Sequence, residues 1–71
     1  MLQYSESGTV KKWLDHLEYG FVTLDDGRGD VYVHSSLLPE GVTQLARGEP
    51  VTIEFVERPD GKLRATRIEL L

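Results

Sequence analysis

Residues 19–34, YGFVTLDDGRGDVYVH, decide the fold of this 71-residue chain. Gly20–Leu24 and Val31–His34 are short runs rich in β-branched and aromatic residues, the composition typical of β-strands. The six residues between them, 25–30, contain an Asp-Gly step and a second glycine, which favour tight turns. The stretch therefore predicts a β-hairpin with a somewhat long loop.

Three further strands are predicted outside the hairpin: Thr9–Leu14, Val51–Glu57 and Leu63–Leu70. Residues 51–57 alternate between apolar and polar side chains, as a half-buried strand does. In the last strand the apolar positions change from odd numbers to even numbers (Leu63, Ala65, then Ile68, Leu70). A one-residue shift of this kind predicts a β-bulge.

The segment that joins the third strand to the fourth contains only one helical turn. Ser35 and Ser36 can cap a turn through Leu38, which Pro39 ends, and the rest up to Pro50 is expected to be loop. Five short strands with no covering helix bury their inner face best by curling on themselves. We therefore expect a single all-β domain over residues 1–71, a small five-stranded antiparallel barrel of the oligonucleotide-binding type.

Composition excludes several classes of protein. The chain has no cysteine, so it has neither disulfides nor thiolate metal sites and must fold by packing alone. No apolar run approaches the roughly 18 residues of a membrane span, and residues 1–6 lack the pattern of a signal peptide. The net charge of −4 argues against gripping a phosphate backbone through bulk positive charge.

The aromatic residues of the hairpin are spaced so that they share a face. Tyr19 and Phe21 are two residues apart, as are Tyr32 and His34, and in a strand such pairs point the same way. If Val31 and Val33 enter the core, the rings stand outside and the hairpin brings all four together. The alternative is that Tyr19 and Phe21 form the core face, which would leave valines exposed in a domain short of core residues. A flat exposed group of rings suits stacking of unpaired bases.

At these residues the sequence resembles the cold-shock domain family. Gly8–Trp13 resembles the family's first strand, Gly-x-Val-Lys-Trp-Phe, and Leu17–Val22 resembles Lys-Gly-Phe-Gly-Phe-Ile in the second. Asp30–His34 resembles Asp-Val-Phe-Val-His in the third, and the latter two stretches match the family's ribonucleoprotein motifs. The similarity runs from about residue 8 to residue 68.

The resemblance implies a barrel that binds single-stranded RNA or DNA, often pyrimidine-rich, in the bacterial cytoplasm, with roles such as RNA chaperone or regulator of transcription or translation. Family members are often acidic and rely on stacking, which answers the objection from net charge. The expected nucleic-acid-binding residues are Lys11, Lys12, Trp13, Tyr19, Phe21, Asp30, Tyr32 and His34. No cofactor, metal, membrane partner or enzymatic activity is expected.

Several positions depart from the family pattern. Aligned without gaps, Lys12 occupies the position of the stacking tryptophan and Trp13 that of the following phenylalanine. Either a bulge returns Trp13 to the rings, or one ring is exchanged for a cation. Leu17-Glu18 replaces Lys-Gly, and Ser35 stands where an aromatic residue usually follows the histidine. These changes predict a narrower and weaker stacking surface than is usual in the family.

Other residues have simpler interpretations beside these roles. Asp30 could accept a hydrogen bond from a base edge, but an aspartate that opens a strand after a glycine turn is more often a turn residue. The cations of the C-terminal part are interpreted most simply as solvated surface, with contact to a long ligand as the alternative (Arg58, Lys62, Arg64, Arg67). His16 is a loop residue that could bind a metal only with Asp15 or Glu18. The rival to nucleic-acid binding is a protein-interaction or self-associating module on the same barrel.

Overall fold

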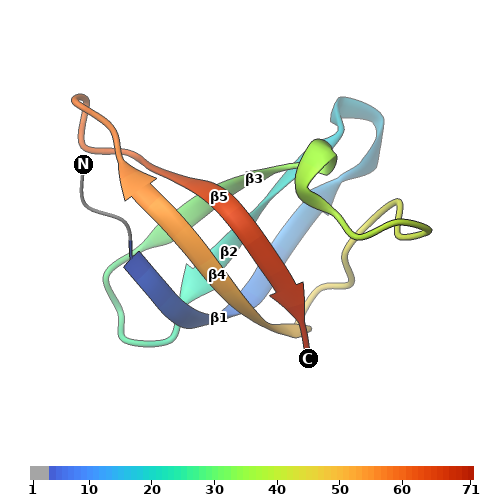
Figure 1. The fold of residues 1–71 in the computed structure, drawn as a ribbon, viewed down its shortest axis with the longest axis horizontal. Coiled ribbons are helices and arrows are strands. Elements are labelled where there is room, and N and C mark those ends of the chain that lie inside the picture. Colours follow the sequence, from blue (N-terminus) through green and yellow to red (C-terminus); the bar gives the residue numbers. More distant parts are fainter. Residues whose placement is uncertain (1–3) are drawn as a thin grey trace.

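The structure, a computed structural model, describes residues 4–71 of the chain. Residues 1–3 lie outside the described region, and with them part of the segment 1–6 that was interpreted as lacking the pattern of a signal peptide. Five strands account for most of it, with two single turns of 3-10 helix between them (Figure 1). The elements are β1 (Tyr4–Leu14), η1 (Asp15–Leu17), β2 (Tyr19–Leu24), β3 (Asp30–His34), η2 (Ser35–Leu37), β4 (Pro50–Glu57) and β5 (Leu63–Leu70). The described residues contain no helix that is long and apolar enough to cross a membrane.

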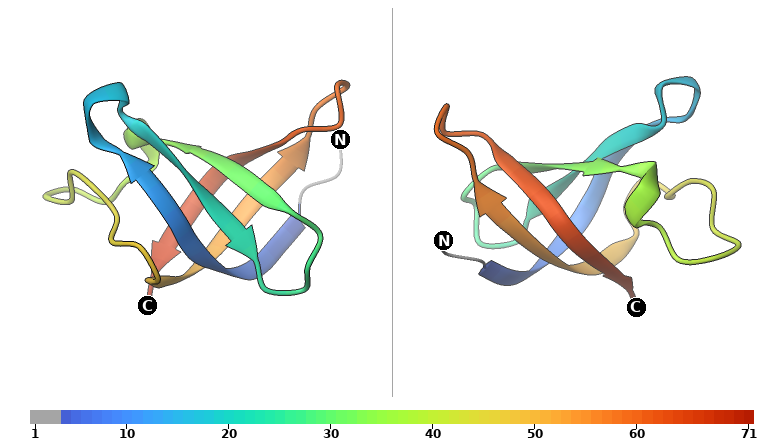
Figure 2. Two further views of the ribbon diagram at one scale, coloured as in Figure 1. Left: turned by 180° about the vertical axis from the view of Figure 1, so that it is seen from behind. Right: turned by 45° about the horizontal axis from the view of Figure 1, so that its top comes forward.

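The strands form a closed barrel in the order β1-β2-β3-β5-β4. Four of the neighbouring pairs are antiparallel, and the barrel is closed by a short parallel pairing of β3 with β5. Figure 2 shows β1, β2 and β3 side by side on one wall of the barrel. The predicted five-stranded barrel is confirmed. Its closure joins strands that are far apart in the sequence.

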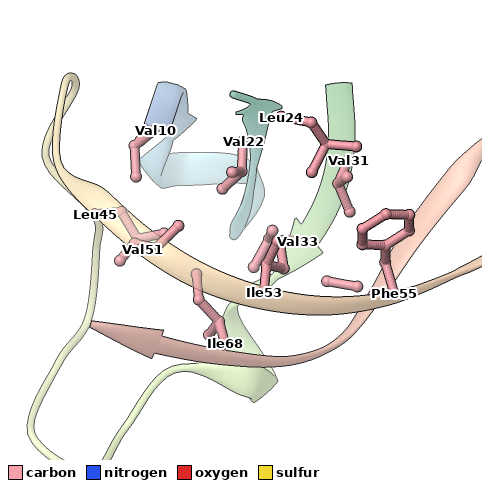
Figure 3. Packing of buried hydrophobic residues seen from close by; sticks show 11 residues of the cluster. Val10, Val22, Leu24, Val31, Val33, Leu45, Val51, Ile53, Phe55 and Ile68 are labelled. Atoms are coloured by element: carbon pink, nitrogen blue, oxygen red, sulfur yellow. The ribbon is translucent and has the colours of Figure 1, made fainter. Parts of the chain in front are cut away.

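Among the described residues, the core consists of eleven buried apolar side chains that point into the barrel from every strand and from one loop residue (Figure 3). They are Val10, Val22, Leu24, Val31, Val33, Leu45, Val51, Ile53, Phe55, Ala65 and Ile68. In β2 and β3, buried and half-buried residues alternate strictly, with the valines inside. None of the buried side chains among the described residues is polar or charged. The barrel is therefore held by packing of apolar side chains.

Two β-bulges interrupt the pairing. In β5 the register moves by one residue, because Arg67 lies opposite Glu54 while Ala65 lies opposite Phe55. Thr66 is thus the extra residue, which confirms the bulge predicted in the last strand. In β1 the pairing moves from Val10 directly to Lys12, so Lys11 is the extra residue there.

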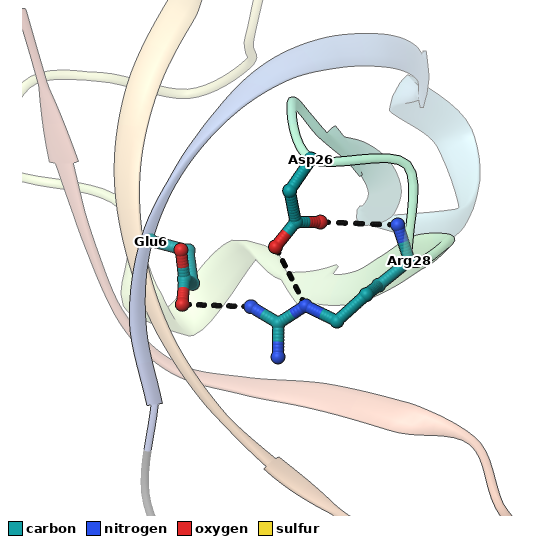
Figure 4. Close-up of polar contacts among 3 residues, drawn as sticks. All are labelled: Glu6, Asp26 and Arg28. Atoms are coloured by element: carbon teal, nitrogen blue, oxygen red, sulfur yellow. Dashed lines mark hydrogen bonds and ion pairs between the residues drawn. The ribbon is translucent and has the colours of Figure 1, made fainter.

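The loop between β2 and β3 is tied to the neighbouring strands by Arg28 (Figure 4). Its guanidinium forms ion pairs of 2.7 Å with Asp26 in the same loop and of 2.7 Å with Glu6 in β1. It also lies 5.6 Å from the ring centroid of Phe55 in β4. Arg28 therefore links three segments at one end of the barrel, and its charge is balanced by two carboxylates.

Candidate nucleic-acid interface

The outer face of β2 and β3 carries four ring side chains, which we call the platform (Tyr19, Phe21, Tyr32 and His34). Each is half-buried and alternates with a buried residue that points inward. The antiparallel register places Tyr19 opposite His34 and Phe21 opposite Tyr32. Residues directly opposite one another share a face of the sheet. The prediction that the valines point inward and the rings outward is confirmed, and the alternative of a core built on Tyr19 and Phe21 is wrong.

Three rings of the platform contact one another. The centroids of Tyr19 and Tyr32 lie 5.2 Å apart with the planes inclined at 35°. Phe21 stands nearly perpendicular to its neighbours, with its centroid 5.8 Å from that of Tyr19 and 6.2 Å from that of Tyr32. Such offset and edge-to-face arrangements are the favourable ones for aromatic pairs. The three rings therefore pack against one another and stabilise each other's position on the outer face.

The bulge in β1 decides which residue joins the platform from that strand. After the bulge Lys12 lies opposite Phe21 and Trp13 lies opposite Gly20, a buried residue. The Lys12 Nζ lies 5.7 Å from the Phe21 ring centroid, whereas Trp13 packs against the core. Of the two alternatives that the sequence left open, the bulge therefore does not return Trp13 to the platform rings, because the extra residue in β1 turns the indole toward the core. One ring has been exchanged for a cation.

Lys11 and Asp30 form an ion pair beside the platform. The Lys11 Nζ donates to Asp30 Oδ2 at 2.8 Å, and Thr23 Oγ1 donates to Asp30 Oδ1 at 2.9 Å. Both carboxylate oxygens of Asp30 are thus engaged within the protein, and the charge of Lys11 is balanced. The observed role of Asp30 is to join the first residue of β3 to β1 and β2. The hydrogen bond from Lys11 holds the pKa of the Asp30 carboxyl below its ordinary value, with the Thr23 hydrogen bond acting in the same direction against partial burial.

This lowered pKa predicts a specific pH dependence of stability. Because folding lowers the pKa of Asp30, the ionised carboxylate stabilises the protein above its unfolded pKa, about 3.9, and this stabilisation is lost as the pH falls through the folded value. Asp30→Asn should therefore reduce the free energy of unfolding at pH 7 by at most about 1 kcal/mol, as expected for a partly exposed pair, and by progressively less below pH 4. Urea denaturation at several pH values measures the difference.

The Lys11→Met variant is the matched control for this experiment, since it removes the donor and keeps the aliphatic stem. Its difference from the wild type should shrink over the same acidic range. A difference that stays constant from pH 7 to pH 3 in both variants would contradict the assignment of the ion pair.

The two histidines have different surroundings. His34 Nδ1 accepts a hydrogen bond of 3.1 Å from the backbone N–H of Ser36 and lies 3.0 Å from its hydroxyl. The neutral ring therefore carries its proton on Nε2, where it can donate to a ligand. His16 lies in the exposed turn η1. No group of three or more metal-ligating side chains occurs among residues 4–71.

Glu18 connects η1 to β2 in a left-handed backbone conformation, with φ of 61°. No other non-glycine residue in the described region has a positive φ. The family pattern has glycine at this position, which adopts that conformation without steric cost. The backbone of Glu18 nevertheless holds the end of β3, because its carbonyl accepts a hydrogen bond of 2.9 Å from the Ser35 N–H.

Sequence reasoning missed one cation at the platform. The parallel pairing of β3 with β5 places Arg64 directly beside Tyr32, and its guanidinium lies 5.8 Å from the ring centroid. A cation at this distance from a ring face interacts favourably with it. No local pattern signals this contact, since residues 32 and 64 meet only when the barrel closes. The platform is therefore flanked by Lys12 on one side and Arg64 on the other.

Comparison with known proteins agrees with this geometry. The model of the family described as "'Cold-shock' DNA-binding domain" matches residues 6–71. The chain is 38% identical over 65 residues to Cold shock-like protein CspA of Shewanella violacea, covering 90% of this chain and 91% of that protein. It is 42% identical over 62 residues to Glycine-rich protein 2 of Nicotiana sylvestris, covering 86% of this chain but 29% of that longer protein. Because this family model matches nearly the whole length of the chain, the chain belongs to the cold-shock DNA-binding domain family.

Proposed function

We propose that this protein binds single-stranded RNA or DNA by stacking unpaired bases on the platform formed by Tyr19, Phe21, Tyr32 and His34. Nucleic-acid binding in general follows from the family; the stacking mechanism and the preference for single strands are our inference. The observation that carries it is the cluster of three mutually supporting rings on the outer face of β2 and β3. Every base has a face that can stack on such rings, whereas duplex DNA conceals its base faces.

The expected affinity follows from the number of rings. Each base stacked on an aromatic side chain contributes roughly 1–3 kcal/mol. Three or four such contacts, less the entropy lost on association, correspond to micromolar binding, about −8 kcal/mol. Holding bases in this way keeps a strand unpaired, which is the physical requirement for an RNA chaperone and for regulation through RNA structure.

The direct test is the binding of a fluorescently labelled hexathymidine, followed by anisotropy. The label belongs on the oligonucleotide, because Trp13 packs against the core and reports poorly on the platform. We expect a dissociation constant in the micromolar range and binding at least about tenfold weaker to a duplex of equal length, which cannot expose its base faces. With Lys12 and Arg64 as the two cations at the platform, the slope of log K against log salt should be about −1.4.

Two results would contradict the proposal. A slope steeper than about −4 would mean that phosphate contacts, not stacking, supply the affinity. Absence of binding to both RNA and DNA strands, together with concentration-dependent self-association, would favour the protein-interaction module instead.

Lys12→Trp tests the exchange of a ring for a cation. Because Lys12 lies opposite Phe21 on the outer face, a tryptophan there should extend the platform and stack one more base. We expect the free energy of binding to hexathymidine to become more favourable by about 1–3 kcal/mol. The slope of log K against log salt should become shallower by about 0.7. Lys12→Ala is the control, since it removes the same charge without adding a ring and should weaken binding. Equal affinities of the two variants would show that the strand does not pass over this position.

A further inference from the structure

A groove of about 610 Å³ adjoins the platform on the side of β5. Phe21 and Tyr32 belong to its lining, so the groove and the platform are continuous. The rest of the lining comes from the β2–β3 loop with the start of β3, from β5, and from the turn between β4 and β5, which projects at one end of the barrel (Figure 1). Its volume lies in the range of sites that hold small ligands, which leaves room for a nucleotide.

The groove is rich in positive charge although the protein as a whole is acidic. Four cations line it, Arg28, Arg58, Lys62 and Arg64, against two carboxylates. Arg28 is paired with Glu6 and Asp26. Among residues 4–71, by contrast, none of the other three cations forms an ion pair. Their charges are therefore available to an anionic ligand.

Each of the two carboxylates that line the groove accepts hydrogen bonds within the protein. Asp30 binds Lys11 and Thr23, as described above. Asp60 Oδ1 accepts a hydrogen bond of 2.9 Å from the backbone N–H of Lys62 and so closes the turn. Neither carboxylate pairs with a cation of the groove within the described residues, so they reduce its positive potential without cancelling it.

The turn that carries two of these cations has a defined shape. Arg58 N–H donates to the Lys62 carbonyl at 2.8 Å, and Gly61 N–H donates to the Arg58 carbonyl at 2.8 Å. Gly61 has a φ of +86°, which glycine adopts without strain. Arg58 and Lys62 are therefore presented from the two ends of a closed turn, on the same side of the barrel as Arg64.

We propose that this groove receives the continuation of the strand that stacks on the platform, and that Arg58, Lys62 and Arg64 bind its phosphates. This inference rests on the proposed function and extends it. Arg64 contacts the Tyr32 ring, so it joins the last stacked base to the first phosphate in the groove. The strand thus runs from the rings of β2 and β3 across the parallel β3–β5 pair toward the β4–β5 turn. Stacking supplies the affinity for a short strand, and the groove supplies additional affinity only for a longer one.

The length of the oligonucleotide separates the two parts of the site. We would compare tetrathymidine, which the four platform side chains can accommodate, with octathymidine, in the wild type and in Arg58→Ala/Lys62→Ala. The double variant should bind tetrathymidine within about twofold of the wild type. It should bind octathymidine about tenfold more weakly at 0.1 M salt, with a salt slope reduced by about 1.4, because two phosphate contacts are lost.

The control Arg47→Ala/Arg67→Ala removes the same charge from positions outside the groove. It should leave the affinity for octathymidine and its salt slope close to the wild-type values. Thermal unfolding checks that both double variants are folded.

Each unfavourable result has a distinct meaning. If octathymidine binds the groove variant as tightly as the wild type, or if the control loses as much affinity, the groove is not part of the strand's path, and stacking on the platform stands. If the wild type binds neither oligonucleotide, both the inference and the proposed function fail.

Discussion

Replacing Phe21 and Tyr32 together with alanine is expected to abolish binding of hexathymidine at micromolar concentrations. The two residues lie opposite each other at the centre of the platform, and Tyr32 also contacts Arg64. At roughly 1–3 kcal/mol for each stacked base, the loss amounts to about 2–6 kcal/mol. A dissociation constant of about 1 μM would then rise to between about 30 μM and 20 mM, and anisotropy titration measures the change.

The double variant should remain folded, because both rings point away from the core. Circular dichroism and thermal unfolding check this. Tyr32→Phe is the matched control, since it keeps the ring and removes only the hydroxyl, and it should bind within about twofold of the wild type if stacking is the main contact. Wild-type affinity in a folded double variant would place the strand on another face of the barrel.

Gly20→Ala is expected to cause the largest loss of stability among single changes at this site. A Cβ atom at position 20 would lie 2.5 Å from the Lys12 carbonyl oxygen and 2.5 Å from Trp13 Cε3. The carbonyl belongs to the paired backbone of β1 and cannot move without breaking the β1–β2 register. Overpacking of this kind costs about 1–3 kcal/mol, and sometimes more. Urea denaturation gives the change in the free energy of unfolding, which is a large part of the stability of so small a domain.

The double variant Gly20→Ala/Trp13→Leu identifies the source of the loss. Removing the indole relieves one of the two close contacts. Trp13→Leu should therefore lower the free energy of unfolding less when it is made in the Gly20→Ala variant than when it is made in the wild type. If Gly20→Ala is as stable as the wild type, Trp13 does not cover Gly20 and its assignment to the inner side of β1 is wrong.

The platform could be predicted from sequence because its cause is local. Along β2 and β3 the side chains alternate between two faces, and Val31 and Val33 can only be placed inside a domain that has few core residues. Once the valines point inward, Tyr32 and His34 must point outward. The bulge in β5 could be predicted for the same reason, since Ala65 and Ile68 are both apolar and lie three positions apart, a spacing that strict alternation would place on opposite faces, and both are buried.

The bulge in β1 could not be decided from the same pattern. Lys11 and Lys12 are consecutive cations, and either of them can stand on the outer face without cost. Only the pairing of β1 with β2 shows that Lys11 is the extra residue and that Lys12 lies opposite Phe21. The position of Trp13 follows from that register and not from its own side chain.

The sequence by itself determined the strands, the inward valines and the exposed rings, because alternation along a strand is a property of neighbouring residues. Tertiary structure alone decided what surrounds the rings. Closing the barrel pairs β3 with β5 in parallel and brings Arg64 to Tyr32 and the β4–β5 turn to the edge of the platform. No short-range preference encodes that closure, since it depends on burying the inner faces of all five strands at once.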